Sequence, residues 1–349
     1  IRHPLPLQSI TQVEWCHPVP RAQGEIMTIH ADSRLLANLE HNLGPVVMDG
    51  LNDPEVVEII LNSDGTIWIE RLGQNMEVAG RMDAAQGRLV ISLVASALET
   101  IVTVARPIVE GELPLDGSRF EGALPPICPA PTFAIRKKAS KVFPLESYAE
   151  NGIMPAHLLD VFYSALQARE NILVVGGTGS GKTTFVNALI RALSEVCPDD
   201  RLVILEDTME LQSLSANTQF YRTSDDVDMT RLLRMTMRMR PDRILIGEVR
   251  DGAALALLKA WNTGHPGGIA TVHANSAEEG LYRLEELIAE ATAAPKHRLI
   301  GHAVDLIVYI ERAQGTGRRI PEVLRINGYN PIEQSYTTQP IYTMEEVIV

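Results

Sequence analysis

The sequence predicts an α/β protein of two domains, a first domain of α+β type and a second domain with a parallel-rich sheet. From residue 151 onward, short apolar runs alternate with stretches of helical periodicity, which is typical of a parallel sheet covered by helices on both faces. A glycine-rich loop, Gly176–Thr183, separates the first apolar run from the first of these helices. The chain has 349 residues, of which 45% are hydrophobic, so it is long enough and apolar enough for two cores.

The first domain is expected to span residues 27–138. A leucine-rich helix is expected to end at Gly44-Pro45, and two β-rich runs around Asp64-Gly65 predict a hairpin. A second helix is expected over residues 89–102. Residues 1–26 have no regular pattern and are interpreted as an irregular arm or as a segment foreign to the natural start. Residues 139–150 are expected to be a linker.

The second domain is expected to span residues 151–325, with a tail at 326–349. Its predicted strands are apolar throughout, as in a sheet buried on both faces: Ile172–Val175, Leu202–Leu205, Ile244–Ile246, Ile269–Val272 and Leu306–Tyr309. Its predicted helices are Thr183–Leu193, Met229–Met239, Gly252–Asn262 and Glu278–Ala289.

The glycine-rich loop reads G-x-x-x-x-G-K-T and lies between a predicted strand and a predicted helix, the context in which this motif binds nucleotide phosphates. Its backbone amides and the helix N-terminus favour an anion. Lys182 can reach the β- and γ-phosphates, and the Thr183 hydroxyl can bind Mg²⁺. The predicted nucleotide-binding residues are Gly176, Gly177, Thr178, Gly179, Ser180, Gly181, Lys182, Thr183 and Thr184.

Three further candidates lie at the carboxyl ends of predicted parallel strands, where ligands of open α/β sheets bind. Glu206 and Glu248 suit two tasks, holding Mg²⁺ and orienting the attacking water, and the sequence leaves open which of them orients water. Glu206 and Thr183 are the predicted metal ligands. His273 ends a third strand and is expected to contact or sense the γ-phosphate. Asp207 is interpreted as a solvated carboxylate, and His265 as a structural histidine.

Composition restricts the partners and the compartment. The formal net charge of −13 makes non-specific nucleic-acid binding unfavourable, so direct nucleic-acid binding is not expected. Three widely spaced cysteines fit a reducing cytosol and argue against a structural zinc site. A local basic cluster is interpreted either as a solvated face or as a subunit interface, and comprises Arg231, Arg234, Arg238, Arg240 and Arg243.

Four segments together resemble the nucleotide-site boxes of the type II and type IV secretion ATPases. They are the phosphate loop, the strand ending at Glu206-Asp207, the Arg-Pro-Asp-Arg to Gly-Glu-Val-Arg segment at 240–250, and the Thr-Gly-His to Thr-Val-His-Ala segment at 263–274. In that family they are the Walker A, Asp, Walker B and His boxes, in this order. The chain is most similar to the conjugative type IV branch and, within it, to the TrbB conjugal-transfer ATPases.

The resemblance implies a PAS-like first domain on a RecA-like ATPase domain, a homo-hexameric ring, and hydrolysis of ATP with Mg²⁺. Segments at 113–120 and 132–138 are similar to the family's Pro-x-Gly-Ser-Arg and Ile-Arg-Lys sequences, which implies that Arg119 and Arg136 reach the nucleotide from the first domain. The family resemblance also implies partners among the inner-membrane components of a secretion complex and a location on the cytoplasmic face of that membrane.

Three alternatives remain at this stage. A type IV pilus or type II secretion motor belongs to the same superfamily, although the four-cysteine zinc module of the type II form is missing. A RecA-like nucleic-acid motor is disfavoured by the acidic balance and by the lack of an aromatic-rich basic groove. A non-hydrolysing scaffold is disfavoured because Lys182, Glu206, Glu248 and His273 are all present.

Overall fold

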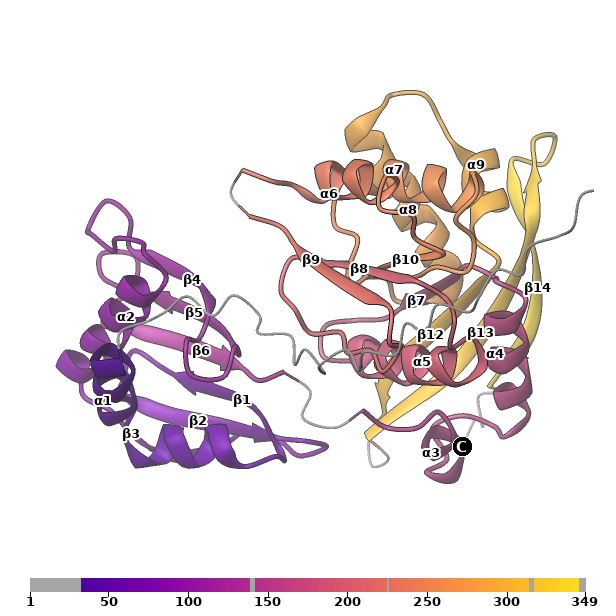
Figure 1. The fold of residues 1–349 in the computed structure, drawn as a ribbon. Helices are drawn as coiled ribbons and strands as arrows, with labels where there is room; N and C mark the ends of the chain where they lie inside the picture. Colours follow the sequence, from indigo (N-terminus) through magenta and orange to yellow (C-terminus); the bar gives the residue numbers. More distant parts are fainter. Residues whose placement is uncertain (1–32, 139–141, 225, 314–316, 345–349) are drawn as a thin grey trace, which may run out of the picture.

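The computed structural model describes residues 33–138, 142–224, 226–313 and 317–344. The expected arm at 1–26 lies outside these residues. Figure 1 shows two bodies beside each other, one formed by the first part of the chain (indigo to magenta) and one by the rest (magenta to yellow). The site described below lies between them.

The N-terminal domain is a six-stranded antiparallel sheet in the order β3-β2-β1-β6-β5-β4, with two helices. Its elements are α1 (Ser33–Asn52), β1 (Val56–Leu61), β2 (Thr66–Arg71), β3 (Glu77–Arg81), α2 (Ala84–Ala97), β4 (Ile108–Glu112), β5 (Arg119–Ala123) and β6 (Thr132–Arg136).

The helix boundaries of this domain differ from the sequence prediction in two places. Gly44, with φ 73°, precedes Pro45 and breaks α1, but the helix resumes and runs to Asn52, so the predicted stop is a kink. The second helix begins and ends earlier than expected, because the Asp83 carboxylate caps it by accepting a hydrogen bond from the Gln86 amide at 2.8 Å. The predicted hairpin of β1 and β2 is confirmed.

One face of this sheet packs against both helices, and the opposite face carries charged side chains together with Ile60 and Trp68. Ile59, Ile69 and Phe133 on the strands form one buried cluster with Leu39 of α1 and Val90 of α2. Because side chains alternate along a strand, the residues between these point to the other face. Charged residues of that opposite face, among them Arg119 and Arg136, line a cavity together with residues of the second domain.

The C-terminal domain has an eight-stranded sheet in the order β14-β13-β12-β7-β11-β10-β8-β9. In this spatial order, each strand from β12 through β7, β11, β10 and β8 to β9 is parallel to its neighbour. Strand β13 pairs antiparallel with β12 on one side and with β14 on the other. The strands are β7 (Ile172–Val175), β8 (Leu202–Glu206), β9 (Thr218–Arg222), β10 (Arg243–Ile246), β11 (Ile269–Val272), β12 (Leu306–Ala313), β13 (Gly317–Asn330) and β14 (Ser335–Thr343). The helices are α3 (Glu146–Glu150), α4 (His157–Gln167), α5 (Lys182–Val196), α6 (Met229–Thr236), α7 (Ala253–Asn262), α8 (Ala277–Ala291) and α9 (His297–Ala303).

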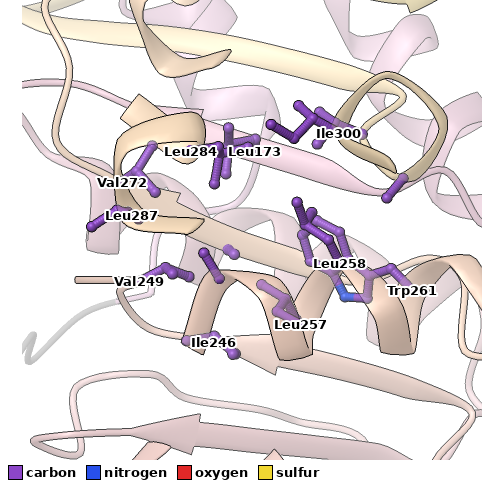
Figure 2. Packing of buried hydrophobic residues seen from close by; sticks show 14 of the residues in the cluster. Leu173, Ile246, Val249, Leu257, Leu258, Trp261, Val272, Leu284, Leu287 and Ile300 are labelled. Carbon is purple, nitrogen blue, oxygen red and sulfur yellow. The ribbon is translucent and has the colours of Figure 1, made fainter. Parts of the chain in front are cut away.

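Both faces of this sheet are buried, as the continuous apolar strands predict. In β7, Leu173 and Val175 join the cluster beneath α6–α9, whereas Ile172 and Val174 join the cluster beneath α3–α5. Figure 2 shows the first cluster, in which Trp261 and Leu257 of α7 pack beside sheet residues such as Ile246. The five predicted strands and four predicted helices are all present, with boundary changes of a few residues.

Two predicted segments of irregular chain are corrected. The expected linker at 139–150 contains α3, and Leu145 and Tyr148 there are only 1% and 4% exposed within the C-terminal core. The expected tail at 326–349 instead contains the end of β13 and all of β14, which are paired in the sheet. Strand β9 was also missed, because its side chains are only partly buried and the strand lacks a continuous apolar run.

Among the described residues, no helix is both long enough and apolar enough to cross a membrane.

Candidate active site

The phosphate loop connects β7 to α5, as the motif predicts. Gly179 and Gly181 have φ angles of 67° and 101°, a backbone conformation that favours glycine. At Gly176 the requirement is steric, since a Cβ atom would lie 2.2 Å from the carbonyl oxygen of Ile310. The loop therefore reaches the N-terminus of α5 in a conformation that other residues would strain, and the helix dipole there favours an anion.

Lys182, the first residue of α5, is 8% exposed and is held by its own loop. Its ammonium donates hydrogen bonds to the carbonyl oxygens of Gly176 and Gly177, both at 2.8 Å, and lies 3.5 Å from Nδ1 of His273. Burial lowers the pKa of Lys182 to about 8, although the charge of Glu248 opposes this shift. A phosphate beside the loop would stabilise the charged ammonium.

Glu248 and His273 meet because they follow β10 and β11, which are neighbouring parallel strands. Nε2 of His273 lies 2.9 Å from Oε1 of Glu248, and Nη2 of Arg250 lies 2.6 Å from Oε2. Burial alone would raise the pKa of Glu248, but the hydrogen bond from Arg250 and the positive charges around it hold that pKa below its ordinary value. Burial, followed by the charge of Lys182, lowers the pKa of His273. The carboxylate is thus ionised and fixed in orientation.

Glu206 ends β8 and is 3% exposed. Its Oε1 atom accepts hydrogen bonds from the backbone amides of Glu210 and Leu211, both at 3.0 Å. Its Oε2 atom is buried and has no hydrogen-bond partner among the described residues. Burial raises the pKa of Glu206 to about 7, against the effect of the two amides. Among the described residues, Glu206 forms no ion pair, and the charge of Lys138 opposes the effect of burial only in part.

The residues present fit a magnesium ion that is shared with a nucleotide. The described residues hold no group of three or more His, Cys, Asp or Glu side chains suited to a metal ion. Mg²⁺ in nucleotide sites needs only one or two protein oxygens, because phosphates and water complete its shell. The unpartnered oxygen of Glu206 and the Thr183 hydroxyl, which line the same cavity, are oxygen ligands of the required kind.

The N-terminal domain contributes a row of charged residues that crosses its sheet. Successive strand pairings join Glu70 to Glu58, Glu58 to Arg136, Arg136 to Arg119, and Arg119 to Glu112. Directly paired residues point to the same face of a sheet. We call these five residues the charged row.

The two ends of the charged row are joined to the C-terminal domain. Glu70 pairs with Arg312 of β12 at 3.0 Å, and Glu112 pairs with Arg222 of β9 at 3.1 Å. Among the described residues, the guanidinium groups of Arg119 and Arg136 in the middle of the row form no hydrogen bond or ion pair. Arg136 instead acts electrostatically on Lys182, whose pKa its charge helps to lower. The middle of the row therefore presents two cations to the phosphate loop.

A cavity of about 650 Å³ lies between the domains and brings the predicted residues together. It is lined by Thr178–Thr184 of the loop region, by Glu206, Glu248 and His273, and by Arg119 and Arg136. Gly176 and Gly177 do not line it. Their carbonyl groups instead accept hydrogen bonds from Lys182.

Three of the arginines that line the cavity were not singled out from the sequence. Arg250 follows Glu248 within the Walker B segment, so its position there was a usable signal. Arg312 donates a hydrogen bond from Nε to the carbonyl oxygen of Gly179 at 2.9 Å, and Arg318 of β13 lies against Gly181. Neither Arg312 nor Arg318 belongs to a local motif, because the antiparallel pairing of β12 with β13, in which these two residues are partners, brings them to the loop.

The structure also shows where the remaining residues discussed from the sequence lie, namely Asp207, His265 and the basic cluster. Asp207 is exposed and accepts a hydrogen bond from Thr223 at 3.0 Å. His265 does not line the cavity. The proposed basic cluster is wrong for Arg243, which is fully buried and donates to Asp200, Leu166 and Gly267. The remaining members, Arg231, Arg234, Arg238 and Arg240, are exposed.

Residues 41–319 match the family described as type II/IV secretion system protein. The chain is 51% identical over 318 residues to the conjugal transfer protein TrbB of Rhizobium radiobacter, covering 91% of this chain and 98% of that protein. It is 50% identical over 315 residues to a probable TrbB of Sinorhizobium fredii, covering 89% and 97%. Protein VirB11 of Agrobacterium fabrum is 30% identical over 320 residues, covering 79% and 90%.

Solved structures share the fold. The ATPase DotB of Legionella pneumophila has a TM-score of 0.57 at 19% identity, covering 84% of this chain and 79% of that one. The pilus retraction motor PilT with bound ADP has a TM-score of 0.56 at 17% identity, covering 86% and 83%. The chain belongs to the type II/IV secretion system protein family, and the sequence prediction of a secretion ATPase with a RecA-like domain is confirmed.

Proposed function

We propose that this secretion ATPase hydrolyses ATP in the cavity between its two domains. One observation carries the proposal: the cavity joins a phosphate loop, the Glu248–His273 pair and the unpaired guanidinium groups of Arg119 and Arg136. A phosphate-binding loop alone supports nucleotide binding. The added carboxylate and the two cations supply the groups that hydrolysis requires.

The roles follow from the contacts. The loop amides and Lys182 bind the β- and γ-phosphates, and Lys182 leaves its carbonyl partners to do so. Mg²⁺, held by Thr183 and Glu206, neutralises charge on the phosphate oxygens when it is bound. Arg119 and Arg136 contact the phosphates from the N-terminal domain, since guanidinium groups form strong charge-assisted bonds to phosphate.

We assign the water-orienting role to Glu248 and the metal role to Glu206. Glu248 is ionised and held by His273 and Arg250, so it can accept a hydrogen bond from water in a fixed direction. Glu206 has a buried, unpartnered oxygen and a raised pKa. A cation would satisfy that oxygen and restore the charged form.

We propose further that hydrolysis powers a conjugative type IV secretion apparatus and that inner-membrane components of that apparatus are the partners, with the protein on the cytoplasmic face. The similarity to two TrbB proteins over nearly their whole length supports this assignment. Direct nucleic-acid binding is not part of the proposal, given the net charge of −13.

We also propose a homo-hexameric ring, as the family resemblance implies. The exposed side of α6 and the following turn offer an interface, because Met235, Met237 and Met239 are exposed beside Arg234 and Arg238. Mass photometry of the purified protein with Mg·ATP is expected to show six copies. A monomer at tens of micromolar, measured by light scattering, would contradict the ring.

Lys182→Ala tests the nucleotide site itself. The variant is expected to lose ATP hydrolysis while remaining folded, because it removes the ammonium that binds phosphate and leaves the apolar core intact. The measurement is phosphate release by the purified protein with Mg·ATP. Lys259→Ala, at an exposed lysine of α7, is the matched control and should retain full activity. Unchanged turnover in Lys182→Ala would refute the assignment of this loop.

A further inference from the structure

Arg318 of β13 lies directly against the last glycine of the phosphate loop. A Cβ atom at Gly181 would lie 2.6 Å from Cδ and 2.7 Å from Nε of Arg318. Gly181 immediately precedes Lys182, and both line the cavity together with Arg318. The guanidinium group of Arg318 is therefore beside the N-terminus of α5, where phosphate-binding amides gather.

Among the described residues, Arg318 forms no ion pair, and its buried Nε atom has no hydrogen-bond partner. The nearby carboxylate, Glu70, pairs with Arg312, which also donates to the carbonyl oxygen of Gly179. Burial, followed by the charge of Arg312, lowers the pKa of Arg318. Two guanidinium groups thus share one carboxylate, and a half-buried cation without a partner is unfavourable unless an anion joins it.

Arg318 and the hydrolytic groups lie beside different parts of the loop region. Arg318 lies against Gly181, whereas the Glu248–His273 pair lies beside the ammonium of Lys182. In phosphate loops the backbone amides cradle the α- and β-phosphates, and the lysine reaches the β- and γ-phosphates. An anion at Arg318 belongs to the part of the nucleotide that ATP and ADP share.

We propose that Arg318 is a further nucleotide-binding residue, whose guanidinium group contacts the α- or β-phosphate. The inference rests on the proposed nucleotide site and adds to it a cation from the antiparallel β12–β13 segment. A planar guanidinium fork suits phosphate oxygens. The contact would satisfy Nε and would relieve the repulsion between Arg318 and Arg312.

The test measures the dissociation constants of ADP and of a non-hydrolysable ATP analogue for the full chain, by competition with a fluorescent nucleotide. Arg318→Ala is expected to weaken both nucleotides to the same extent, by about tenfold or more, as for loss of a charge-assisted bond. Arg318→Lys should recover part of the affinity because it keeps the charge. The melting temperature without nucleotide should not fall, since the substitution removes an unpaired cation.

Arg319→Ala is the matched control, because Arg319 is the next residue and its Nε lies 2.6 Å from Oε1 of Glu311. It should bind both nucleotides as the wild type does. Wild-type affinity in Arg318→Ala, with Lys182→Ala defective, would overturn the inference and leave the proposed function standing. Wild-type affinity in Lys182→Ala would instead overturn the proposed site.

One further outcome would also overturn the inference. Weakening of the ATP analogue alone would place Arg318 at the γ-phosphate.

Discussion

The two walls of the cavity differ in how their charges are satisfied. On the C-terminal wall, Lys182 is bonded to loop carbonyl groups, and Glu248 is bonded to His273 and Arg250. On the N-terminal wall, ion pairs join the ends of the charged row, Glu70 and Glu112, to the C-terminal domain. Among the described residues, Arg119 and Arg136 form no hydrogen bond or ion pair through their guanidinium groups, although the charge of Arg136 acts on the neighbouring Glu58.

This difference indicates separate tasks for the two domains. Paired groups keep their geometry without a ligand, so the C-terminal wall is preorganised for the reaction. In the proposed site, Arg119 and Arg136 would gain phosphate partners when nucleotide binds, so we expect the N-terminal wall to respond to nucleotide. Hydrolysis would remove part of that partner, and the contact between the domains would then change with the state of the nucleotide.

The paired wall is tested by Glu248→Gln, for which we expect the largest effect. The substitution keeps the shape of the side chain but removes the negative charge that, in the proposed function, orients water. Turnover should fall by roughly 10² or more while Mg·ATP affinity is retained. Steady-state hydrolysis and equilibrium binding on the same preparation measure the two quantities separately.

Glu286→Gln is a suitable control, since Glu286 is a surface residue of α8 paired with Arg283. A large loss of affinity with little change in turnover would contradict the assignment of Glu248. The water-orienting role would then move to Glu206, and Glu248 would become mainly a metal-binding residue.

Glu206 differs from the other groups of the C-terminal wall because it forms no ion pair among the described residues. Burial raises its pKa to about 7, so we expect the stability of the protein to depend on pH, an effect smaller than that of Glu248→Gln on turnover. A carboxyl whose pKa is raised by folding stabilises the protein below its unfolded pKa, near 4.5, and loses that contribution as the pH rises through 7. The amide side chain of the Glu206→Gln variant cannot ionise, so the variant does not lose stability in this way. With EDTA and without nucleotide, the variant should gain stability relative to wild type between pH 5 and pH 8, by at most about 3 kcal/mol.

Urea denaturation at several pH values measures this difference. Mg·ADP should reduce the difference, because a cation at Glu206 favours the charged form. If the free energies of unfolding of Glu206→Gln and wild type changed in parallel with pH, the carboxyl would not be desolvated as described. That result would remove the support for the metal role of Glu206.

The sequence prediction was accurate for segments with a continuous apolar pattern and wrong for short or exposed segments. Buried parallel strands such as β7 and β11 were predicted with their observed bounds, because both faces are apolar and the run is continuous. Strand β14 was taken for a tail because most of its side chains are exposed and it contains Pro340. Helix α3 was taken for a linker, since five residues are too few to show a period.

The site residues, too, could be predicted where a local sequence pattern determines their position. Glu206, Glu248 and His273 could be placed because parallel strands end at one edge of the sheet, so position in a strand gives position in space. Arg119 and Arg136 came from a family resemblance, and the register of β5 and β6 gives them a physical reason to be neighbours. Arg312 and Arg318 were missed because an antiparallel return brings them to the loop, and no local pattern records such a contact.

The central claim is that the N-terminal wall completes the nucleotide site, and Arg119→Ala tests it most directly. ATP affinity or turnover should fall on the order of 10²-fold, because a charge-assisted phosphate contact is lost in a site shielded from water. Arg136→Ala should act in the same direction with a smaller effect. The control is Arg88→Ala, at an exposed residue of α2 away from the cavity.

The decisive measurement is the rise in melting temperature that Mg·ATP produces, which reports ligand binding to the folded protein. For Arg119→Ala the melting temperature without nucleotide should match that of wild type, and the rise with Mg·ATP should be strongly reduced. A rise equal to that of wild type in Arg119→Ala and in Arg136→Ala, with full hydrolysis in both, would show that the N-terminal wall does not bind the nucleotide.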